Sequence, residues 1–427
     1  MSRTLLLSLL IYGLIILGLA SLQRELLALV IPLILYLGAG LLFGPRSIDL
    51  TIKRTLSADR VPHGQPVQVK VTITNNGPTL ENLLLADLYP QELSVINGFA
   101  ETLTRLQSSE TIELTYTLNG KRGYYQFGGL QVTASDLLGL FRKQARLAAP
   151  GYLFILPEVF RLPNVVVQPR RTRAYPGINR ARKGGPGVEF YGVREYQPGD
   201  SLRWLNKRAS ARHEQTLYVN EFEQERAVDI GLIMDARQKT NLNIGGVSLF
   251  EHTVQATTTL AETFLSQGNR VGLFIYGGFI DWTFPGSGKI QRERILQALA
   301  RAKLQNSMVF QKLEMLPTRL FPPRSQLVFI SPLRLEDLEE LIKVRAHGYP
   351  LLVASPDYVS FEEKTLEQTS MMALAARIAR LERRQLFRRM REMGIQVFEW
   401  QVDTPFHEAA QIAFSRSPFL QWRVGDL

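Results

Sequence analysis

Two long apolar runs at the start of the chain constrain its fold more than any other feature of the sequence. Residues 4–22 and 26–43 are almost entirely apolar, and only the three polar residues 23–25 separate them. About 20 helical residues cross the roughly 30 Å hydrocarbon core of a bilayer, so each run is close to spanning length. A cleaved signal peptide, with an apolar core of roughly 7 to 15 residues, fits this pattern less well. Residues 1–47 are therefore predicted to form a transmembrane helical hairpin.

The charges beside these runs predict the orientation of the hairpin. Arg3 precedes the first run, and three basic residues follow the second, namely Arg46, Lys53 and Arg54. Counting positive charges on each side places the rest of the chain in the cytoplasm, as a multi-pass protein of the cell membrane. Gly40 and Gly44 form a G-x-x-x-G pair that would let two such helices pack closely in a homodimer. Ordinary membrane-helix glycines are the alternative interpretation.

Residues 48–156 have a different pattern, in which apolar and polar residues alternate over short runs. Two clear runs are 67–74 and 112–118, and turn residues such as Asn97-Gly98 lie between the runs. Period-two alternation broken by turns at this spacing is typical of a small antiparallel β-sandwich. We therefore expect an immunoglobulin-like sandwich domain after the hairpin.

The region 227–427 alternates apolar runs of strand length with helical patterns. The predicted strands are 228–234, 270–276, 279–284, 326–330, 350–354 and 395–400. Apolar strands interleaved with helices are typical of a parallel sheet that is covered on both faces. The chain of 427 residues is long enough for about three domains. Its last domain is predicted to be a doubly wound α/β domain.

Charge is concentrated in two places rather than spread over the chain. The net charge is +11, and residues 161–214 alone carry 12 Lys or Arg against 4 Asp or Glu. The predicted helix 371–392 is rich in arginine and has an apolar stripe, so we expect a surface helix with a basic outer face. Such surfaces suit anionic lipid or an acidic protein. Nucleic acid is not expected, because aromatic residues do not interleave with the basic ones.

The predicted sheet edge contains the candidate residues for a metal site. Asp235 directly follows the first strand, where ligands of doubly wound sheets bind. In the von Willebrand A arrangement this edge carries D-x-S-x-S and a later aspartate, whose oxygens hold Mg²⁺. Here Arg237 and Lys239 replace the serines, and Ser331 and Pro332 stand in the later loop. We hypothesise that one of the two cations replaces the metal as the counter-ion of Asp235; an aspartate that merely caps the next element is the alternative.

Motifs for catalysis are absent from the sequence. There is no cysteine, the five histidines are scattered, and no serine lies in a nucleophile elbow. Glu189 and Asp200 are the carboxylates that a membrane-tethered hydrolase or transferase would use. Among so many arginines, however, they are expected to form structural ion pairs. We therefore favour a non-enzymatic protein without a cofactor.

The segment 185–212 carries a family resemblance. Its core reads Gly185-Pro186-Gly187-Val188-Glu189-Phe190-Tyr191-Gly192-Val193-Arg194-Glu195-Tyr196-Gln197-Pro198-Gly199-Asp200-Ser201-Leu202-Arg203. This resembles the signature of the bacterial and archaeal family called domain of unknown function 58. The segments 121–125, 135–141 and 219–225 also resemble parts of that family, so the resemblance extends over nearly the whole chain. The chain departs from the family pattern in two respects. Lys207 stands where the family usually has tryptophan, with Trp204 at an arginine position, and the family's metal motif is often more complete than the one around Asp235.

The resemblance implies a function that the residues alone do not. It implies a membrane-anchored cytoplasmic protein with a von Willebrand A-like domain over 227–427, preceded by the family's signature segment over 157–226. It also implies an adaptor or scaffold that works beside a MoxR-type AAA+ ATPase in assembling or activating an unidentified client protein. The expected partner-binding residues are Glu189, Arg194, Glu195, Asp200, Arg203 and Arg212. A basic surface for lipid or nucleic acid is the further alternative.

Overall fold

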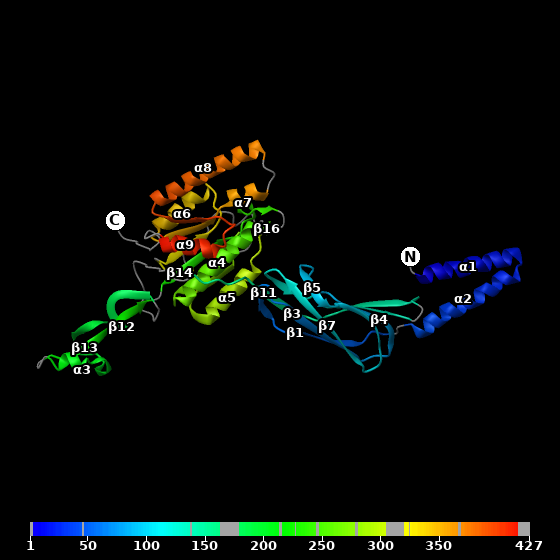
Figure 1. The fold of residues 1–427 in the computed structure, drawn as a ribbon. Helices are drawn as coiled ribbons and strands as arrows, with labels where there is room; N and C mark the ends of the chain where they lie inside the picture. Colours follow the sequence, from blue (N-terminus) through cyan, green and yellow to red (C-terminus); the bar gives the residue numbers. More distant parts are fainter. Residues whose placement is uncertain are drawn as a thin grey trace. The chain divides into compact units, whose positions relative to one another are not determined.

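The computed structural model describes most of the chain as two compact units, residues 1–156 and 157–427 (Figure 1). The described residues are 3–44, 47–136, 139–162, 179–212, 216–226, 228–244, 247–277, 281–304, 320–323, 325–365 and 369–416. Within these ranges helices and sheets are both abundant, which confirms the predicted mixed α/β class. Each unit is described by itself.

The first unit begins with two helices in the predicted places. Helix α1 is Arg3–Ser21 and helix α2 is Arg24–Phe43, with Leu22 in the left-handed backbone region (φ 53°) at the turn between them. Among the described residues, α1 over Thr4–Ser21 is the one helix whose length and composition suit a membrane crossing. A second crossing, and hence the multi-pass topology and its orientation, stays a prediction.

Gly40 in α2 lies against the same chain rather than open to a second copy. The residue is buried, and a Cβ atom at this position would lie 3.0 Å from side-chain atoms of Leu140 and Phe141. The predicted dimer contact through Gly40 and Gly44 therefore competes with packing inside the unit. This arrangement gives the glycine a local role, because only a residue without a side chain lets Leu140 and Phe141 approach so closely.

The rest of the first unit contains two antiparallel four-stranded sheets and one shared core. The first sheet has the order β1-β3-β7-β5 and the second β10-β9-β4-β6. Their bounds are β1 Leu50–Leu56, β3 Val67–Asn75, β4 Leu80–Asp87, β5 Leu93–Gly98, β6 Glu101–Leu106, β7 Thr111–Gly120, β9 Leu130–Ser135 and β10 Arg142–Leu147. A small third sheet joins β2 Arg60–Pro62, β11 Tyr152–Leu156 and β8 Gly123–Gln126.

Alternating burial explains why these segments form two packed sheets. In β3 every second residue is buried, from Val67 to Asn75, and these side chains join a single apolar cluster with residues of the second sheet such as Leu85 and Val132. Apolar side chains at every second position of a strand leave one face for the core and one for water. The two sheets can therefore share one core, while an immunoglobulin-like fold of this region stays a prediction.

The second unit is built around a six-stranded sheet with the order β18-β17-β14-β19-β20-β21. The strands are β14 Asp229–Asp235, β17 Arg270–Tyr276, β18 Asp281–Gly286, β19 Gln326–Ile330, β20 Leu351–Pro356 and β21 Gln396–Trp400. All neighbouring pairs are parallel except β17 and β18, which are antiparallel. The third predicted strand is thus an antiparallel edge strand, and its alternating exposure fits a strand with one solvated face.

Helices cover both faces of this sheet and create two cores (Figure 1). On one face pack α4 Leu249–Ser266, α5 Gly288–Arg301 and α9 Phe406–Arg416, and on the other α6 Asp337–Ala346 and α8 Ser370–Glu392. Shorter elements are α7 Tyr358–Thr365, η2 Gln238–Thr240, β15 Asn243–Ile244 and β16 Val247–Ser248. The central strands β14 and β19 are buried along nearly their whole length, as expected for strands covered on two sides.

The Gly/Arg-rich segment forms a separate antiparallel ladder. Strand β12 is Asn179–Glu195 and strand β13 is Tyr218–Arg226, and between them lie the short helices η1 Leu202–Trp204 and α3 Lys207–Ser210. The ladder contains register shifts around Gly184 to Gly192, where glycines interrupt regular pairing. We call the part from Arg194 to Val219 the hairpin tip.

Candidate functional site

The order of strands in the parallel sheet places a potential site between β14 and β19. After β14 the chain first adds β17 on one side of it, and later returns to add β19 on the other side. Loops diverge at such a switch point, where doubly wound proteins commonly bind ligands. Asp235 ends β14 and Ser331 follows β19, so the structure places both side chains at this point.

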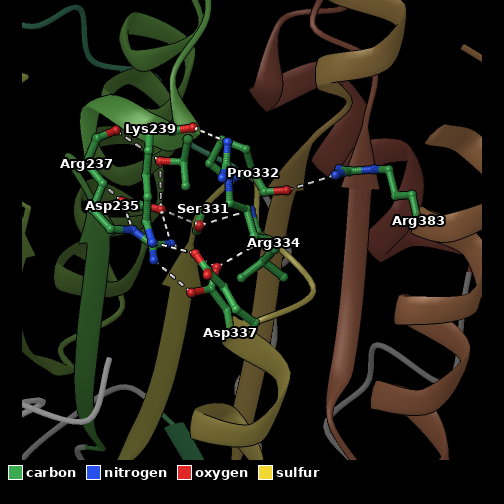
Figure 2. Close-up of polar contacts among 11 residues, drawn as sticks. Asp235, Arg237, Lys239, Ser331, Pro332, Arg334, Asp337 and Arg383 are labelled. Atoms are coloured by element: carbon green, nitrogen blue, oxygen red, sulfur yellow. Dashed lines mark hydrogen bonds and ion pairs between the residues drawn. The ribbon is translucent and has the colours of Figure 1, made fainter. Parts of the chain in front are cut away.

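A buried guanidinium lies at the centre of the switch point and joins two carboxylates (Figure 2). Arg237 Nη2 donates to Asp235 Oδ2 at 2.8 Å and Arg237 Nε donates to Asp235 Oδ1 at 3.0 Å. The same guanidinium donates from Nη1 and Nη2 to the two carboxylate oxygens of Asp337, at 2.7 and 2.8 Å. Arg237 is 2% exposed, so both ion pairs are shielded from water. Arg237, and not Lys239, is thus the counter-ion of Asp235.

Two hydroxyl groups complete the surroundings of Asp235. Ser331 Oγ donates to Asp235 Oδ2 at 2.7 Å, and Thr240 Oγ1 donates to the same oxygen at 3.1 Å. The Asp235 carboxylate also accepts a hydrogen bond from the backbone N–H of Arg237 at 2.9 Å. Carboxylates and hydroxyls of this kind could ligate Mg²⁺, but here they all surround a guanidinium. The alternative of an aspartate that only caps the next element does not describe this network.

Electrostatics keep the Arg237 guanidinium charged. Burial works against its charge, but the surrounding Tyr276, Asp337 and Asp235 raise the pKa of Arg237 above its ordinary value. The Arg237 guanidinium also lies 5.2 Å from the centre of the Tyr276 ring. Burial, followed by the charge of Asp235, raises the pKa of the Tyr276 phenol well above its ordinary value. The centre of the network is therefore a guanidinium that stays protonated.

The backbone at this edge has features that hold the network in place. Leu333 is buried and adopts a positive φ of 57°, which is costly for a side chain of this type. Its N–H donates to Ser331 Oγ at 3.0 Å, so the same hydroxyl supports the turn and contacts Asp235. Gly277 has a φ of 151°, and a Cβ there would approach the backbone of Ala236 to 2.5 Å. A glycine is thus required where β17 passes the loop after β14.

Lys239 and Pro332 lie at the outer side of the network. The Lys239 ammonium pairs with Glu336 and lowers the pKa of that carboxyl. The Lys239 carbonyl accepts a hydrogen bond from Arg334 Nη2 at 2.8 Å (Figure 2). The Pro332 carbonyl accepts a hydrogen bond from Arg383 Nη1 at 2.8 Å. The loops after β14 and β19 are thus tied to each other and to α8.

Arg383 is a second buried arginine, and the sequence analysis placed it wrongly. It was expected on the basic outer face of its helix, but it is 4% exposed and points toward the strand ends (Figure 2). It donates to Ser355 Oγ at 2.9 Å and to the Pro356 carbonyl at 2.7 Å, and it pairs with Glu399. With Pro332 these contacts join the ends of β19, β20 and β21. A guanidinium has five donors, which is why one side chain can satisfy so many acceptors.

The sequence analysis also missed Asp337. It expected Ser331 and Pro332 in place of a later aspartate, but the aspartate is present six residues after Ser331, at the first position of α6. Its carboxylate accepts a hydrogen bond from the Arg334 N–H at 2.8 Å and so closes the turn before the helix. Acidic residues are common in the first turn of helices, so the local sequence pattern did not indicate that Asp337 contacts Arg237.

A second cluster lies at the hairpin tip and contains most of the predicted partner-binding residues. Arg194 donates from Nη1 and Nη2 to the two carboxylate oxygens of Asp200, both at 2.7 Å. Asp200 ends the turn Gln197-Pro198-Gly199-Asp200, in which Gly199 has a φ of 108° and Asp200 accepts from the Gln197 N–H at 2.8 Å. The Arg194 hydrogen bond is the main reason why the pKa of Asp200 is lowered. The pair fixes the turn in one conformation.

The other predicted partner-binding residues are distributed around this turn. Glu195 is exposed, and its carbonyl accepts from Arg194 Nη1 at 2.9 Å. Arg203 in η1 and Arg212 just after α3 are exposed. Glu189 lies in β12, but its side chain is outside the described residues. The structure thus gathers Arg194, Glu195, Asp200, Arg203 and Arg212 in one tip, separate in the fold from Asp235.

Apolar side chains surround the charged ones at the hairpin tip, which the sequence analysis did not anticipate. Leu202 is 72% exposed, and the other exposed large apolar residues of this ladder are Phe190, Val193, Trp204 and Leu217. The tip has a small interior, because Val219 is buried and Asn206 caps α3 by accepting from the Ala209 N–H at 2.9 Å. An ordered turn with exposed aromatic, aliphatic and arginine side chains has the composition of a protein-binding surface.

These observations define the class of protein as mixed α/β, with a parallel sheet whose ligand edge is closed by buried ion pairs and with an appended β-ladder. Residues 192–357 match the family described as protein of unknown function DUF58, which confirms the predicted resemblance over this region. The matched residues include both the Arg194–Asp200 pair and the Asp235–Arg237–Asp337 network.

Individual relatives add little beyond the family. The chain is 27% identical over 252 residues to uncharacterized protein YeaD of Bacillus subtilis strain 168, which covers 58% of this chain and 60% of that relative. Among solved structures, a CARDB domain from Pyrococcus furiosus is 16% identical over 26% of this chain and 90% of its own, with a TM-score of 0.19. A FixG-related protein from Vibrio parahaemolyticus is 8% identical over 25% of this chain and 95% of its own, with a TM-score of 0.18.

Proposed function

We propose that this chain is a membrane-anchored, non-enzymatic adaptor that binds a partner protein through its hairpin tip. The observation that carries the proposal is the Arg194–Asp200 pair, which orders a turn whose neighbouring side chains are exposed. An ordered surface binds at a lower entropic cost than a flexible one. Aromatic and arginine side chains, which this tip exposes, are the residue types most enriched at binding hot spots.

The properties of the two carboxylate clusters support a binding role over a catalytic one. Acid/base catalysis near neutral pH by a carboxyl group needs a pKa that is raised toward the working pH. Arg194 lowers the pKa of Asp200 instead, which weakens the hydrolase or transferase alternative that uses Asp200 or Glu189. Asp235 is enclosed by Arg237, Ser331 and Thr240 and has little access to a substrate.

The wider arrangement in this proposal follows the family resemblance. The partner would be a MoxR-type AAA+ ATPase, and the α/β domain would be of the von Willebrand A type with Arg237 in place of a metal ion. Helices α1 and α2 would form the membrane hairpin, and the immunoglobulin-like sandwich would separate the α/β domain from the membrane. The buried Arg237 and the apolar α1 are the features that agree with this arrangement.

Purification from native membranes with and without ATP tests the proposal. The wild-type chain is expected to co-purify with an AAA+ ATPase, and Arg203→Glu is expected to reduce its recovery by about tenfold or more, because it reverses an exposed charge beside the ordered turn. Arg294→Glu is the matched control, since Arg294 is an exposed arginine on α5 outside the tip. It should recover the same amount of partner as the wild type.

Melting curves decide how a loss of binding is interpreted. Arg203→Glu should unfold at the same temperature as the wild type, because its side chain is exposed. Recovery of no ATPase under either condition, or unchanged recovery with Arg203→Glu, would contradict the proposal. If binding and thermal stability fall together, the tip residues are structural and the adaptor surface lies elsewhere.

A further inference from the structure

Helix α8 has an exposed apolar stripe on the side opposite to the core. The sequence predicts one apolar stripe on this helix, but the apolar residues of α8 lie on two different faces. Met390 is fully buried, together with Ala376, Leu386 and Phe387. Met371, Leu374, Ile378 and Leu381 are instead 77%, 56%, 49% and 56% exposed. The helix therefore packs on its own domain with one face and presents a second apolar face to the outside.

The spacing of the exposed stripe is that of a coiled-coil seam. The intervals between its four residues are three, four and three positions, so Met371 and Ile378 take heptad positions a while Leu374 and Leu381 take positions d. In parallel coiled coils, a β-branched residue at a together with leucine at d favours two strands. Ile378 between Leu374 and Leu381 has this arrangement. The next a position is Gln385, which is exposed.

We propose that this stripe is the interface between two copies of the chain, whose α8 helices pack side by side in parallel. The charges that flank the stripe favour a second copy of the chain as the partner and a parallel direction of the two helices. Arg377 takes position g and Glu382 takes position e, and both are exposed. In a parallel pair, residue g of one helix meets residue e five positions later on the other helix. Arg377 would therefore pair with Glu382 of the second copy, twice by symmetry.

An antiparallel pair or an anionic membrane fits the same charges less well. Antiparallel helices bring g positions together, and here these are Arg377 and Arg384, which repel. Lipid binding would favour basic residues on both sides of the stripe, whereas one side carries Arg377 and the other carries Glu382. One basic and one acidic flank make the stripe complementary to a second copy of itself.

The same geometry limits the length of the interface. The following g–e pair would bring Arg384 against Arg389 of the second copy, so the seam should end at about Leu381. Three helical turns form a weak dimer on their own. A carboxylate introduced at position 389 should extend the seam, which allows a test by gain of association as well as by loss.

Disulfide cross-linking tests the proposal on the full chain, because the natural sequence contains no cysteine. Leu374→Cys is placed in the seam, and Ala373→Cys, which is also exposed on α8, is the matched control outside it. The proteins are reconstituted into phosphatidylcholine vesicles and oxidised. Leu374→Cys is expected to give a covalent dimer, since equal d positions face each other only in a parallel pair. Ala373→Cys is not expected to cross-link, because position 373 lies outside the seam.

Charge variants in the Leu374→Cys background give the decisive outcomes. Glu382→Arg should reduce the cross-linked fraction at least about threefold, adding Arg377→Glu should restore it, and Arg389→Glu should increase it. Circular dichroism melts confirm that each variant is folded. Absence of cross-linking, cross-linking unaffected by Glu382→Arg, or equal cross-linking of Ala373→Cys would overturn the proposal. If the cysteine of Leu374→Cys is shielded only when the vesicles contain anionic lipid, the stripe binds lipid and the proposal is likewise overturned.

Discussion

The sheet edge and the hairpin tip use the same chemical pair in two different environments. At the sheet edge Arg237 holds Asp235 through two hydrogen bonds of 2.8 and 3.0 Å, and at the tip Arg194 holds Asp200 through two of 2.7 Å. The Arg237 side chain is 2% exposed and that of Arg194 is 36% exposed. Burial therefore decides the role: the first pair contributes to the integrity of the domain, and the second orders a surface.

The largest expected effect is that of removing the buried guanidinium. Arg237→Ala leaves Asp235 and Asp337 buried close to each other without a counter-ion. Breaking a buried ion pair in this way costs about 3 to 5 kcal/mol in the free energy of unfolding. Urea denaturation of the full chain in detergent measures it. Lys239→Ala is the control, because the Lys239–Glu336 pair is half-exposed and should contribute about 1 kcal/mol or less.

Replacing Arg383 is expected to cause a somewhat smaller loss in the free energy of unfolding. Arg383→Met fills a similar space but leaves the buried carbonyls of Pro332 and Pro356 without their donor. Each buried unsatisfied acceptor costs about 1 to 3 kcal/mol, so the two carbonyls together are expected to cost at least about 2 kcal/mol. The same denaturation experiment checks it. A loss below that of Lys239→Ala would show that the strand ends are not held by this side chain.

Removing the half-exposed guanidinium of Arg194 should reduce partner binding and leave the stability of the chain nearly unchanged. Arg194→Ala releases the turn at Asp200 and should weaken partner recovery, while the unfolding temperature of the whole chain changes little, because exposed ion pairs contribute little to global stability. Pull-down and differential scanning calorimetry on the same preparation measure both quantities. A large drop in unfolding temperature would remove the distinction between the two regions.

The smallest effect is a shift in titration at the tip. The pKa of Asp200 is lowered from its ordinary value of 3.8, first by the hydrogen bonds from Arg194 and then by the Gln197 N–H. The pair is thus intact above pH 3.8 and is lost only as the pH falls through the lower folded-state pKa. Carbon-detected NMR of the Asp200 carboxyl should show a midpoint below 3.8 that rises in Arg194→Ala. A midpoint at or above 3.8 in the wild type contradicts the pair.

The sequence predicted the main elements because their patterns are local. Strands such as 270–276 and 326–330 are continuous apolar runs bounded by polar residues, and the structure places them within a residue of the prediction. The sequence also predicted Asp235 at the end of a buried strand, because the apolar run of the strand ends directly before it. The choice of Arg237 over Lys239 was left open and needed the fold.

The residues that sequence reasoning missed depend on contacts between distant segments. Asp337 lies 100 positions from Arg237 in the chain, and its place in a first helical turn has an ordinary local explanation. Arg383 belongs to a helix with many arginines, and no local pattern shows which of them points inward. The same helix has apolar residues on two faces, so helical periodicity could not show that Leu374 and Ile378 are exposed.

Isothermal titration calorimetry with Mn²⁺ tests most directly the claim that Arg237 occupies the place of a metal ion at the sheet edge. We expect no binding of Mn²⁺ at micromolar concentrations to the wild-type chain, because the oxygens of Asp235 and Asp337 are already engaged by the guanidinium. Micromolar binding of Mn²⁺ to the wild type that is abolished by Asp235→Asn would contradict it.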